Sequence, residues 1–235
     1  MQHQKNPDCH ECTVRCMGVF CELENNLLDT ANEKKKCNTY KKGDTIFYEE
    51  NHPMGLFCVF NGKAKVFKTN DQGKEQIVRL AKEGDVLGYR ALISGEPYNA
   101  SAVALEDCRI CFIPQNAFIG FLKDSKNLFV QITNLLSNDL KSAENQMASL
   151  SQKSVRERVA DTLLMLRTFY GVENDGKTLK SNLSREDLAN IVGTATESLI
   201  RMLSEFRNEG LIDLSNKKIT IANLEKLKRV AHQFN

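Results

Sequence analysis

Four of the eight cysteines in this sequence lie close together near its beginning, in the stretch CHECTVRCMGVFC. Cysteine thiolates bind zinc and iron–sulfur clusters, and a C-x-x-C pair is typical both of such sites and of redox-active thiols. A disulfide framework is an alternative use of crowded cysteines, and plain burial is another. The candidate ligands or redox groups in this stretch are Cys9, Cys12, Cys16 and Cys21.

The composition is that of an ordinary globular protein. The 235 residues are 41% hydrophobic and 26% charged, with a formal net charge of +2. This charge is too small to indicate a nucleic-acid partner, so such a function has to be argued from local patterns. No apolar run is long enough to span a membrane, and the N-terminus lacks the apolar stretch of a signal peptide. We therefore expect a cytoplasmic protein without membrane contact, in which thiols stay reduced and serve metal or redox chemistry.

The region from about residue 36 to 115 has the pattern of a β domain. Glycine-containing turn dipeptides recur along it, and short runs rich in β-branched and aromatic residues lie between them. Short strands at roughly even spacing with such turns are typical of antiparallel sandwiches and barrels. A short helix is expected before this region, in ELENNLLDTANEKK.

Beyond Pro114, apolar residues recur every three or four positions along a segment without glycine or proline. Such a narrow stripe predicts a long helix that pairs with the same helix of a second copy. The alternative is an amphipathic helix that packs on its own β domain. The predicted dimerisation residues are Phe129, Ile132, Leu136, Leu140, Ala143, Met147 and Leu150.

The stretch LSREDLANIVGTATESLIRMLSEF has the pattern of two short helices joined at a glycine. Ser184 with Asp187 predicts an N-cap that begins the first helix, and Gly193 marks the break. Thr194 with Glu197 predicts a second capping box. Two β runs around a polar turn follow in LIDLSNKKITIAN, so the whole segment predicts a winged helix-turn-helix.

The second of these helices has an apolar face and an opposite face that is free to meet a partner. Glu197 and Arg201 lie one turn apart on the free face, near the start of the helix, where recognition helices reach base edges. Arginine suits guanine and glutamate accepts from cytosine, so the pair predicts contacts with G·C base pairs. A plain surface ion pair, or a capping role for Glu197, is the alternative. The candidate DNA-contacting residues are Ser184, Arg185, Thr194, Thr196, Glu197, Ser198 and Arg201.

The order of these parts, together with the E-S-x-x-R core of the second helix, resembles the Crp/Fnr family of bacterial transcription regulators. The resemblance runs from about residue 20 to 232, and stretches such as GTATES and SREDLA are most similar to regulators of the Bacteroidetes type. It implies an α+β chain with a cyclic-nucleotide-binding-like β-roll of the jelly-roll type, a long dimerisation helix and a C-terminal winged helix-turn-helix. The expected parts are a cysteine-rich segment at 1–24, the β-roll sensor at 25–122, the dimerisation helix at 123–152 and the DNA-binding domain at 153–235.

The resemblance also implies partners. A homodimer is expected to bind double-stranded palindromic DNA, with half-sites about one helical turn apart, and to contact RNA polymerase. Cyclic AMP is not expected as a ligand, because Tyr89 and Ala100 stand where cyclic-AMP-binding relatives carry glutamate and arginine. Without that arginine, a cyclic phosphate loses its charge-assisted contact.

The oxygen-sensing branch of this family holds a 4Fe-4S cluster on N-terminal cysteines and one β-roll cysteine. By that resemblance, the implied ligands are Cys9, Cys12, Cys16 and Cys111, with Cys21 as an alternative to Cys16. The cysteine spacing departs from that of the best-known sensors, so zinc, thiol-based redox sensing and the absence of a cofactor stay open. Burial in the core is expected for Cys37 and Cys58, and is the alternative for Cys111.

Two other classes of function fit the sequence less well than a DNA-binding regulator. A cyclic-nucleotide-binding module of an enzyme or channel would carry the intact glutamate and arginine and no wing. An enzyme would need a nucleophile–base or metal constellation, and the four histidines, which are spread along the chain, form none. The sequence therefore predicts a DNA-binding transcription regulator and not an enzyme, with a cofactor-free family member as the remaining alternative.

Overall fold

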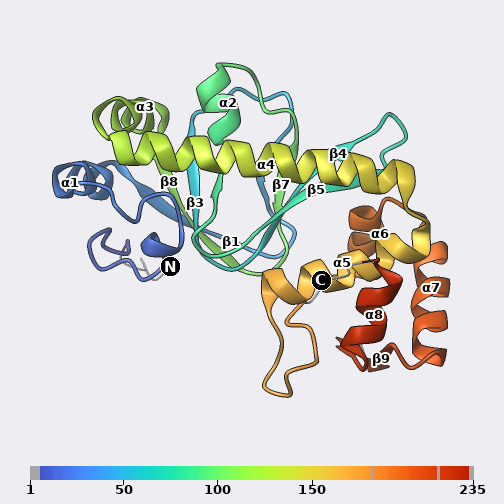
Figure 1. Ribbon diagram of the computed structural model, residues 1–235. Helices are drawn as coiled ribbons and strands as arrows, with labels where there is room; N and C mark the ends of the chain where they lie inside the picture. The colour runs from blue at the N-terminus through green and yellow to red at the C-terminus, as the bar shows by residue number, and fades with distance from the viewer. Residues whose placement is uncertain (1–5, 182, 216–217, 233–235) are drawn as a thin grey trace. The chain divides into compact units, whose positions relative to one another are not determined.

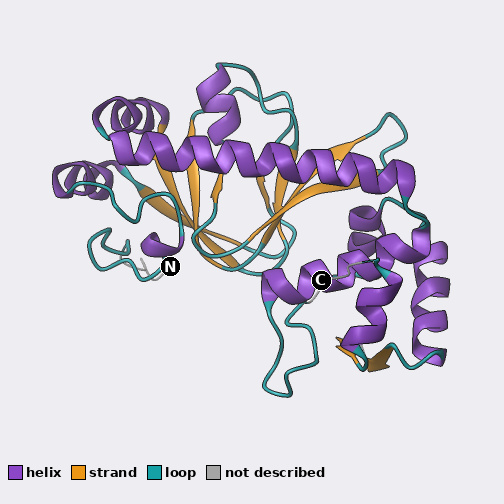
Figure 2. Ribbon diagram, viewed as in Figure 1, coloured by secondary structure: helices purple, strands orange, loops and turns teal. Residues whose placement is uncertain are grey.

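The computed structural model describes residues 6–181, 183–215 and 218–232, and it divides into two compact units (Figures 1 and 2). The first unit comprises Met1–Lys74 and Val78–Lys141, and the second comprises Glu75–Ile77 and Ser142–Asn235. The four domain bounds expected from the sequence are not tested by this division and stay predictions. Among the described residues, no helix is both long and apolar enough to cross a membrane.

Two antiparallel four-stranded sheets form the β-roll of the first unit. One sheet has the strand order β1-β8-β3-β6 and the other has the order β2-β7-β4-β5. These orders bring strands together that are far apart in the sequence, as jelly rolls do. The strands are β1 (Lys36–Tyr40), β2 (Thr45–Phe47), β3 (Gly55–Asn61), β4 (Ala64–Thr69), β5 (Glu75–Ala81), β6 (Val86–Leu87), β7 (Ser101–Ala104) and β8 (Cys108–Pro114).

Side chains from both sheets fill the interior of the roll. Phe57 and Val59 of β3 point inward, and they belong to the same buried cluster as Val66 of β4 and Ala102 of β7. Leu56, next to Phe57 on the same strand, belongs to a different cluster on the outer face. This alternation is the two-residue period of a strand, and it gives the first sheet two buried faces.

Helices cover the outer face of the first sheet. Leu28 of α1, Phe118 of α3 and Ile132 of α4 join Leu56 in the second buried cluster. The N-terminal segment, including the 3-10 turn η1 (Arg15–Met17), lies beside them. The helices of this unit are α1 (Asn25–Lys34), α2 (Tyr89–Ser94), α3 (Gln115–Asp124) and the first part of α4 (Lys126–Gln152).

Helix α4 is as long and unbroken as the sequence predicts, but its apolar stripe serves two purposes. Ile132 is only 3% exposed and packs in the outer cluster of its own β-roll, with Leu136 partly buried beside it. Phe129, Leu140 and Met147 are 59%, 63% and 65% exposed. The placement of Ile132 in the dimer seam was therefore wrong, because the first turns of α4 already need that side to cover the sheet.

The second unit is a helix-turn-helix followed by a β hairpin. Its core holds Leu163 of α5, Leu188 of α6, Phe206 of α7 and Ile219 of β10, all buried. The polar turn of the hairpin, at residues 216–217, lies outside the described residues. The elements are α5 (Val155–Tyr170), α6 (Arg185–Val192), α7 (Thr196–Asn208), β9 (Ile212–Ser215), β10 (Lys218–Ile221) and α8 (Leu224–Val230).

Candidate nucleic-acid interface and cysteine-lined cavity

The start of α6 is fixed by the capping box that the sequence predicts. The hydroxyl of Ser184 accepts a hydrogen bond from the backbone N–H of Asp187 at 2.9 Å, and the Asp187 carboxylate accepts from the N–H of Ser184 at 3.2 Å. At the other end, Gly193 has a φ of 71°, the left-handed conformation that ends a helix and favours glycine. Local sequence thus sets both ends of the first helix of the motif.

The second capping box is not formed, so that prediction was wrong. Helix α7 begins at Thr196 with Ala195 as its N-cap, and no side chain caps it. The backbone N–H of Thr194 donates instead to the carbonyl of Ala189 at 3.1 Å. Thr194 therefore belongs to the closing turn of α6, one position too early to cap α7.

Helix α7 has the two faces that the sequence predicts. Leu199, Leu203 and Phe206 are buried, whereas Glu197 and Arg201 are exposed. Within the described part of the chain, neither Glu197 nor Arg201 has a side-chain hydrogen bond or ion pair, so the surface pair weighed as an alternative is not formed. Both side chains are available to a partner.

The other predicted DNA-contacting residues lie at the starts of α6 and α7. Ser184 is exposed at the start of α6, while Thr194, Thr196 and Ser198 are half-buried near the turn. Arg185 is also half-buried, and burial lowers the pKa of its guanidinium. The predicted set therefore occupies the starts of the two helices of the motif, and its contact with DNA stays a prediction.

An arginine that the sequence analysis missed holds the turn of the motif. Arg158 on α5 donates to the carbonyls of Val192 and Gly193 at 3.1 and 3.2 Å, and to that of Lys153 at 2.9 Å. A neighbouring residue, Arg156, pairs with Glu209 at 2.6 Å. Nothing in the local sequence marks Arg158, because the two carbonyls of the turn that it holds lie about 35 positions away.

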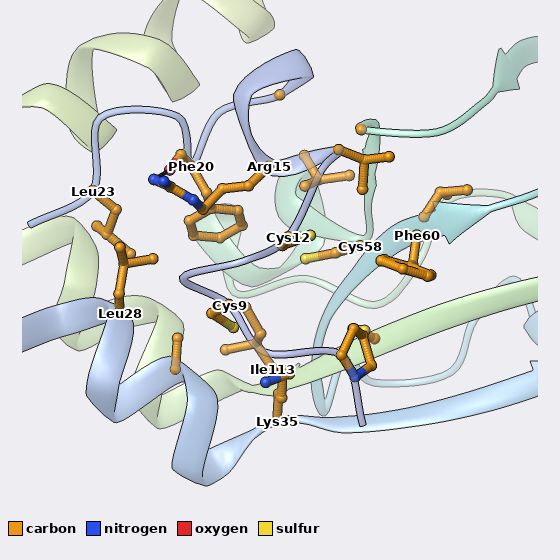
Figure 3. Close-up of a pocket in the computed structure, with 18 residues that line it drawn as sticks. Cys9, Cys12, Arg15, Phe20, Leu23, Leu28, Lys35, Cys58, Phe60 and Ile113 are labelled. Carbon is orange, nitrogen blue, oxygen red and sulfur yellow. Dashed lines mark hydrogen bonds between the residues drawn. The ribbon is translucent and has the colours of Figure 1, made fainter. Parts of the chain in front are cut away.

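A cavity of about 80 Å³ lies on the outer face of the roll and contains four of the cysteines in its wall (Figure 3). Two come from the N-terminal segment, Cys9 and Cys12, and two from the sheet, Cys58 and Cys111. Figure 3 shows the side chains of Cys12 and Cys58 pointing toward one another. Three of the predicted ligands thus line one cavity, together with Cys58, which was expected to be a plain core residue.

The N-terminal segment is held to the roll by specific contacts. The backbone N–H of Cys9 donates to the Asn32 side chain on α1 at 3.1 Å, and His10 bonds Asp29 on the same helix at 2.8 Å. A side chain at Gly18 would collide with the carbonyl oxygen of Gly84, so only glycine fits there. These contacts position Cys9 and Cys12 over the sheet.

The two other N-terminal cysteines do not line the cavity. Cys16 is exposed, and a side-chain hydrogen bond with Cys16 raises the pKa of the Cys21 thiol. The predicted group of Cys9, Cys12, Cys16 and Cys111 is therefore not brought together as a set, and neither is the alternative with Cys21. Cys16 lies within the 3-10 turn Arg15–Met17, away from the cavity wall that holds Cys9 and Cys12.

The sulfur of Cys111 is bonded to that of Cys37 in a disulfide. The two residues lie directly opposite each other on β8 and β1. A disulfide sulfur is not a thiolate, so in this state the predicted role of Cys111 as a ligand is not met, and Cys37 is not a plain core residue. Cys108 lies buried in the roll interior, on the opposite face of β8 from Cys111.

Two cations line the cavity. Lys35 is 5% exposed and lines the cavity beside Cys9, where its charge opposes the rise in the Cys9 pKa that burial causes. Arg15 donates to the carbonyls of Phe20 and Cys21, and its buried Nε has no hydrogen-bond partner among the described atoms. Buried N–H donors and cations suit a negatively charged thiolate centre. As placed, no three metal-binding side chains of the described residues converge on one point.

Tyr89 and Ala100, which stand where the resemblance places the lost cyclic-nucleotide contacts, line a second cavity. This cavity measures about 30 Å³, with Arg90 also in its wall, and by this measure it has room for about two water molecules. The Tyr89 ring is 1% exposed, and its hydroxyl donates to Asp139 of α4. The tyrosine therefore supports the packing of α4 at the position where a ribose contact would lie.

Comparisons with known proteins agree with both units. Residues 37–125 match the model of the cyclic nucleotide-binding domain, and residues 157–230 match the Crp-like helix-turn-helix domain. These ranges correspond to the β-roll with its following helix, and to the helix-turn-helix with its hairpin.

Among curated proteins, the electron transport regulator A of Shewanella oneidensis is 30% identical over 227 residues, which are 95% of this chain and 90% of that one. The fumarate and nitrate reduction regulatory protein of Escherichia coli is 29% identical with the same coverage. FixK2 from Bradyrhizobium japonicum has a similar structure with a TM-score of 0.76, at 23% identity over 83% of this chain and 96% of that one. A Crp/Fnr-family transcriptional regulator from Thermus thermophilus has a TM-score of 0.71, at 25% identity over 84% and 98% of the two chains. The chain belongs to the Crp/Fnr family of transcription regulators.

Proposed function

We propose that the protein is a homodimeric regulator that reads inverted-repeat DNA with Glu197 and Arg201, and whose binding to DNA responds to redox conditions through its cysteines. The observation that carries the DNA-reading part is the unpaired state of these two exposed side chains near the start of α7. An arginine without an internal partner keeps its donors for guanine, and a free glutamate keeps its acceptors for cytosine.

Dimerisation is supported by the part of α4 that the β-roll does not cover. Leu140, Ala143 and Met147 are exposed at spacings of three and four residues. Apolar residues at these spacings on a helix form the seam of a two-stranded coiled coil. Two parallel copies would place two recognition helices on the two half-sites of a palindrome. As the family resemblance implies, the bound dimer would act on RNA polymerase in the cytoplasm.

The redox part is supported by the cysteine-lined cavity and by the names of two relatives, which refer to electron transport and to fumarate and nitrate reduction. Cys9, Cys12 and Cys111 would hold a 4Fe-4S cluster with one further thiolate. When bound, such a cluster supplies electron exchange at a potential set by its surroundings. Lys35 and the unpartnered Nε of Arg15 would offset its negative charge.

A thiol-based switch without a cluster is the second candidate, and the Cys37–Cys111 disulfide is the observation that favours it. The two candidates differ in iron content and in the response to thiol reductants. A cluster regulator contains iron and sulfide after anaerobic purification and loses them in air. A disulfide regulator contains neither, and its DNA binding changes with dithiol treatment alone.

The test is selection of DNA sites by the full-length protein, purified anaerobically and assayed before and after exposure to air. We expect a palindromic consensus, and we expect Arg201→Ala to cost about 1–3 kcal/mol of binding free energy and relax specificity at one position of each half-site. Arg207→Ala, at an exposed position near the other end of α7, is the matched control and should leave the consensus unchanged. An equal loss for Arg201→Ala on all sequences would instead indicate a phosphate contact and contradict base reading.

A further inference from the structure

Three cysteines form a row across the first sheet of the roll. Cys37 of β1 lies opposite Cys111 of β8, and Cys111 lies opposite Cys58 of β3. Residues opposite each other on neighbouring strands point to the same face, with Cβ atoms about 5 Å apart. The sulfur of Cys111 therefore has one cysteine on each side, and it is bonded to only one of them.

Cys58 is the member of this row that faces the N-terminal pair. It shares the cavity wall with Cys9 and Cys12, and in Figure 3 its side chain points toward Cys12. The cavity thus brings together two cysteines of the segment and two of the sheet.

Two charged side chains, Arg15 and Lys35, lie in the otherwise largely apolar wall of the cavity. The Nε of Arg15 is buried there without a partner in the described part of the chain, and Lys35 is buried beside Cys9. An orphan buried donor costs about 1–3 kcal/mol, so an acceptor bound in this cavity would stabilise Arg15 in its wall. Thiolate or inorganic sulfur is an acceptor of this kind.

We propose that Cys58 is the fourth thiolate of a metal centre with Cys9, Cys12 and Cys111, in place of Cys16 or Cys21. The inference rests on the cysteine-based sensing proposed above and names its ligand set. Cys16 and Cys21 lie outside the cavity and contact each other, so they would have to leave their present positions to serve.

Formation of this centre requires that the Cys37–Cys111 disulfide first be reduced. An external dithiol supplies two electrons and two protons, becomes a disulfide itself, and leaves Cys37 and Cys111 as thiols. The four ligand thiols then lose their protons as the metal binds. In the oxidised state the Cys111 sulfur is bonded to Cys37, and no three metal-binding side chains of the described residues converge on one point.

The test is reconstitution of the full-length protein with ferrous iron, sulfide and dithiothreitol under anaerobic conditions. Iron, acid-labile sulfide and visible absorption are measured for the wild type, for Cys58→Ala, and for Cys16→Ala and Cys21→Ala as matched controls. We expect Cys58→Ala to lose the iron and the absorption that the wild type takes up, and Cys16→Ala and Cys21→Ala to keep both. The thermal midpoint checks that each variant is folded, and Cys58→Ser replaces Cys58→Ala if the alanine variant is not.

The outcomes separate this inference from the function on which it rests. Wild-type protein with iron, together with iron loss in Cys58→Ala alone, supports the assignment of Cys58. Full iron content in Cys58→Ala, with loss in Cys16→Ala or Cys21→Ala, overturns that assignment and leaves cluster sensing intact. A wild type that takes up no iron overturns both the ligand set and the cluster, while DNA site selection still tests the regulator itself.

Discussion

The hydroxyl of Tyr89 donates a hydrogen bond to the carboxylate of Asp139, which connects α2 of the β-roll to the middle of α4. Arg79 of β5 completes the group, because it donates to the same hydroxyl at 3.1 Å and lies 3.7 Å from Asp139. All three side chains belong to the first unit. The group therefore holds α4, the proposed dimerisation helix, against the β-roll, the proposed sensor domain.

Tyr89→Phe should lower the free energy of unfolding by about 1–3 kcal/mol, since it removes a hydrogen bond to a charged group. Equilibrium unfolding in urea measures this change. Tyr98→Phe is the matched control: Tyr98 is also buried, but its hydroxyl has no hydrogen-bond partner among the described residues. Equal losses for the two variants would mean that the hydroxyl–carboxylate contact does not contribute.

The elements that local sequence determines were predicted well. The Ser184 capping box and the left-handed Gly193 set the ends of α6 within a few residues, so the helix-turn-helix could be read directly. The second capping box failed by one position, because the N–H of Thr194 closes the preceding helix. The sequence pattern allowed α7 to begin one residue earlier, with Thr194 as its N-cap. The hydrogen bond from Thr194 to Ala189 instead places the N-cap at Ala195.

The cysteine site could not be predicted, because it depends on strand register. The spacing of Cys37, Cys58 and Cys111 along the chain does not reveal that β8 lies between β1 and β3. The role of Ile132 was missed for a similar reason, since one heptad pattern fits both a dimer seam and a sheet-covering face. The spacing of apolar residues along a helix shows which of them share a face, but only the tertiary structure shows what packs on that face.

Arg158→Ala should weaken DNA binding although Arg158 lies outside the recognition helix. Its guanidinium holds the carbonyls of Val192 and Gly193, so its loss frees the turn that orients α7. We expect a loss of about 2–3 kcal/mol in unfolding free energy, as for hydrogen bonds from a charged group. Affinity measured on the selected site should fall without a change in the preferred sequence.

The control for this prediction is Arg167→Ala on the same helix. The Arg167 side chain has no hydrogen bond to another described residue, so its loss should affect neither stability nor affinity beyond a few tenths of a kcal/mol. A changed base preference in Arg158→Ala would contradict the assignment, since it would place this arginine at the DNA.

Asp175 should make the second unit sensitive to acid. Hydrogen bonds from the Thr178 hydroxyl and from the backbone N–H groups of Thr178 and Lys177 lower the pKa of Asp175 to about 2. A carboxylate with a lowered pKa stabilises the fold above its unfolded value of about 4, and this contribution is lost as the pH falls toward 2. The difference in thermal midpoint between the wild type and Asp175→Asn should therefore be constant above about pH 5 and shrink below pH 4. A difference that stays the same at pH 2.5 would contradict the role of the charged form.

Leu140→Glu should convert the dimer to a monomer. Leu140 is 63% exposed on α4 in the single chain, and pairing with a second copy would bury it in both chains. Burial of a leucine contributes about 2 kcal/mol per chain, and a glutamate at the same place would bring two like charges together in an apolar seam. Sedimentation of the full-length protein measures the change, and DNA with a single half-site should then bind as well as the palindrome.

Asn145→Glu is the matched control, because Asn145 is exposed on the same helix but lies off the apolar stripe. It adds the same charge and should leave the protein dimeric. If Leu140→Glu also stays dimeric, the two copies associate through another surface. If both variants dissociate, net charge and not the apolar seam controls assembly.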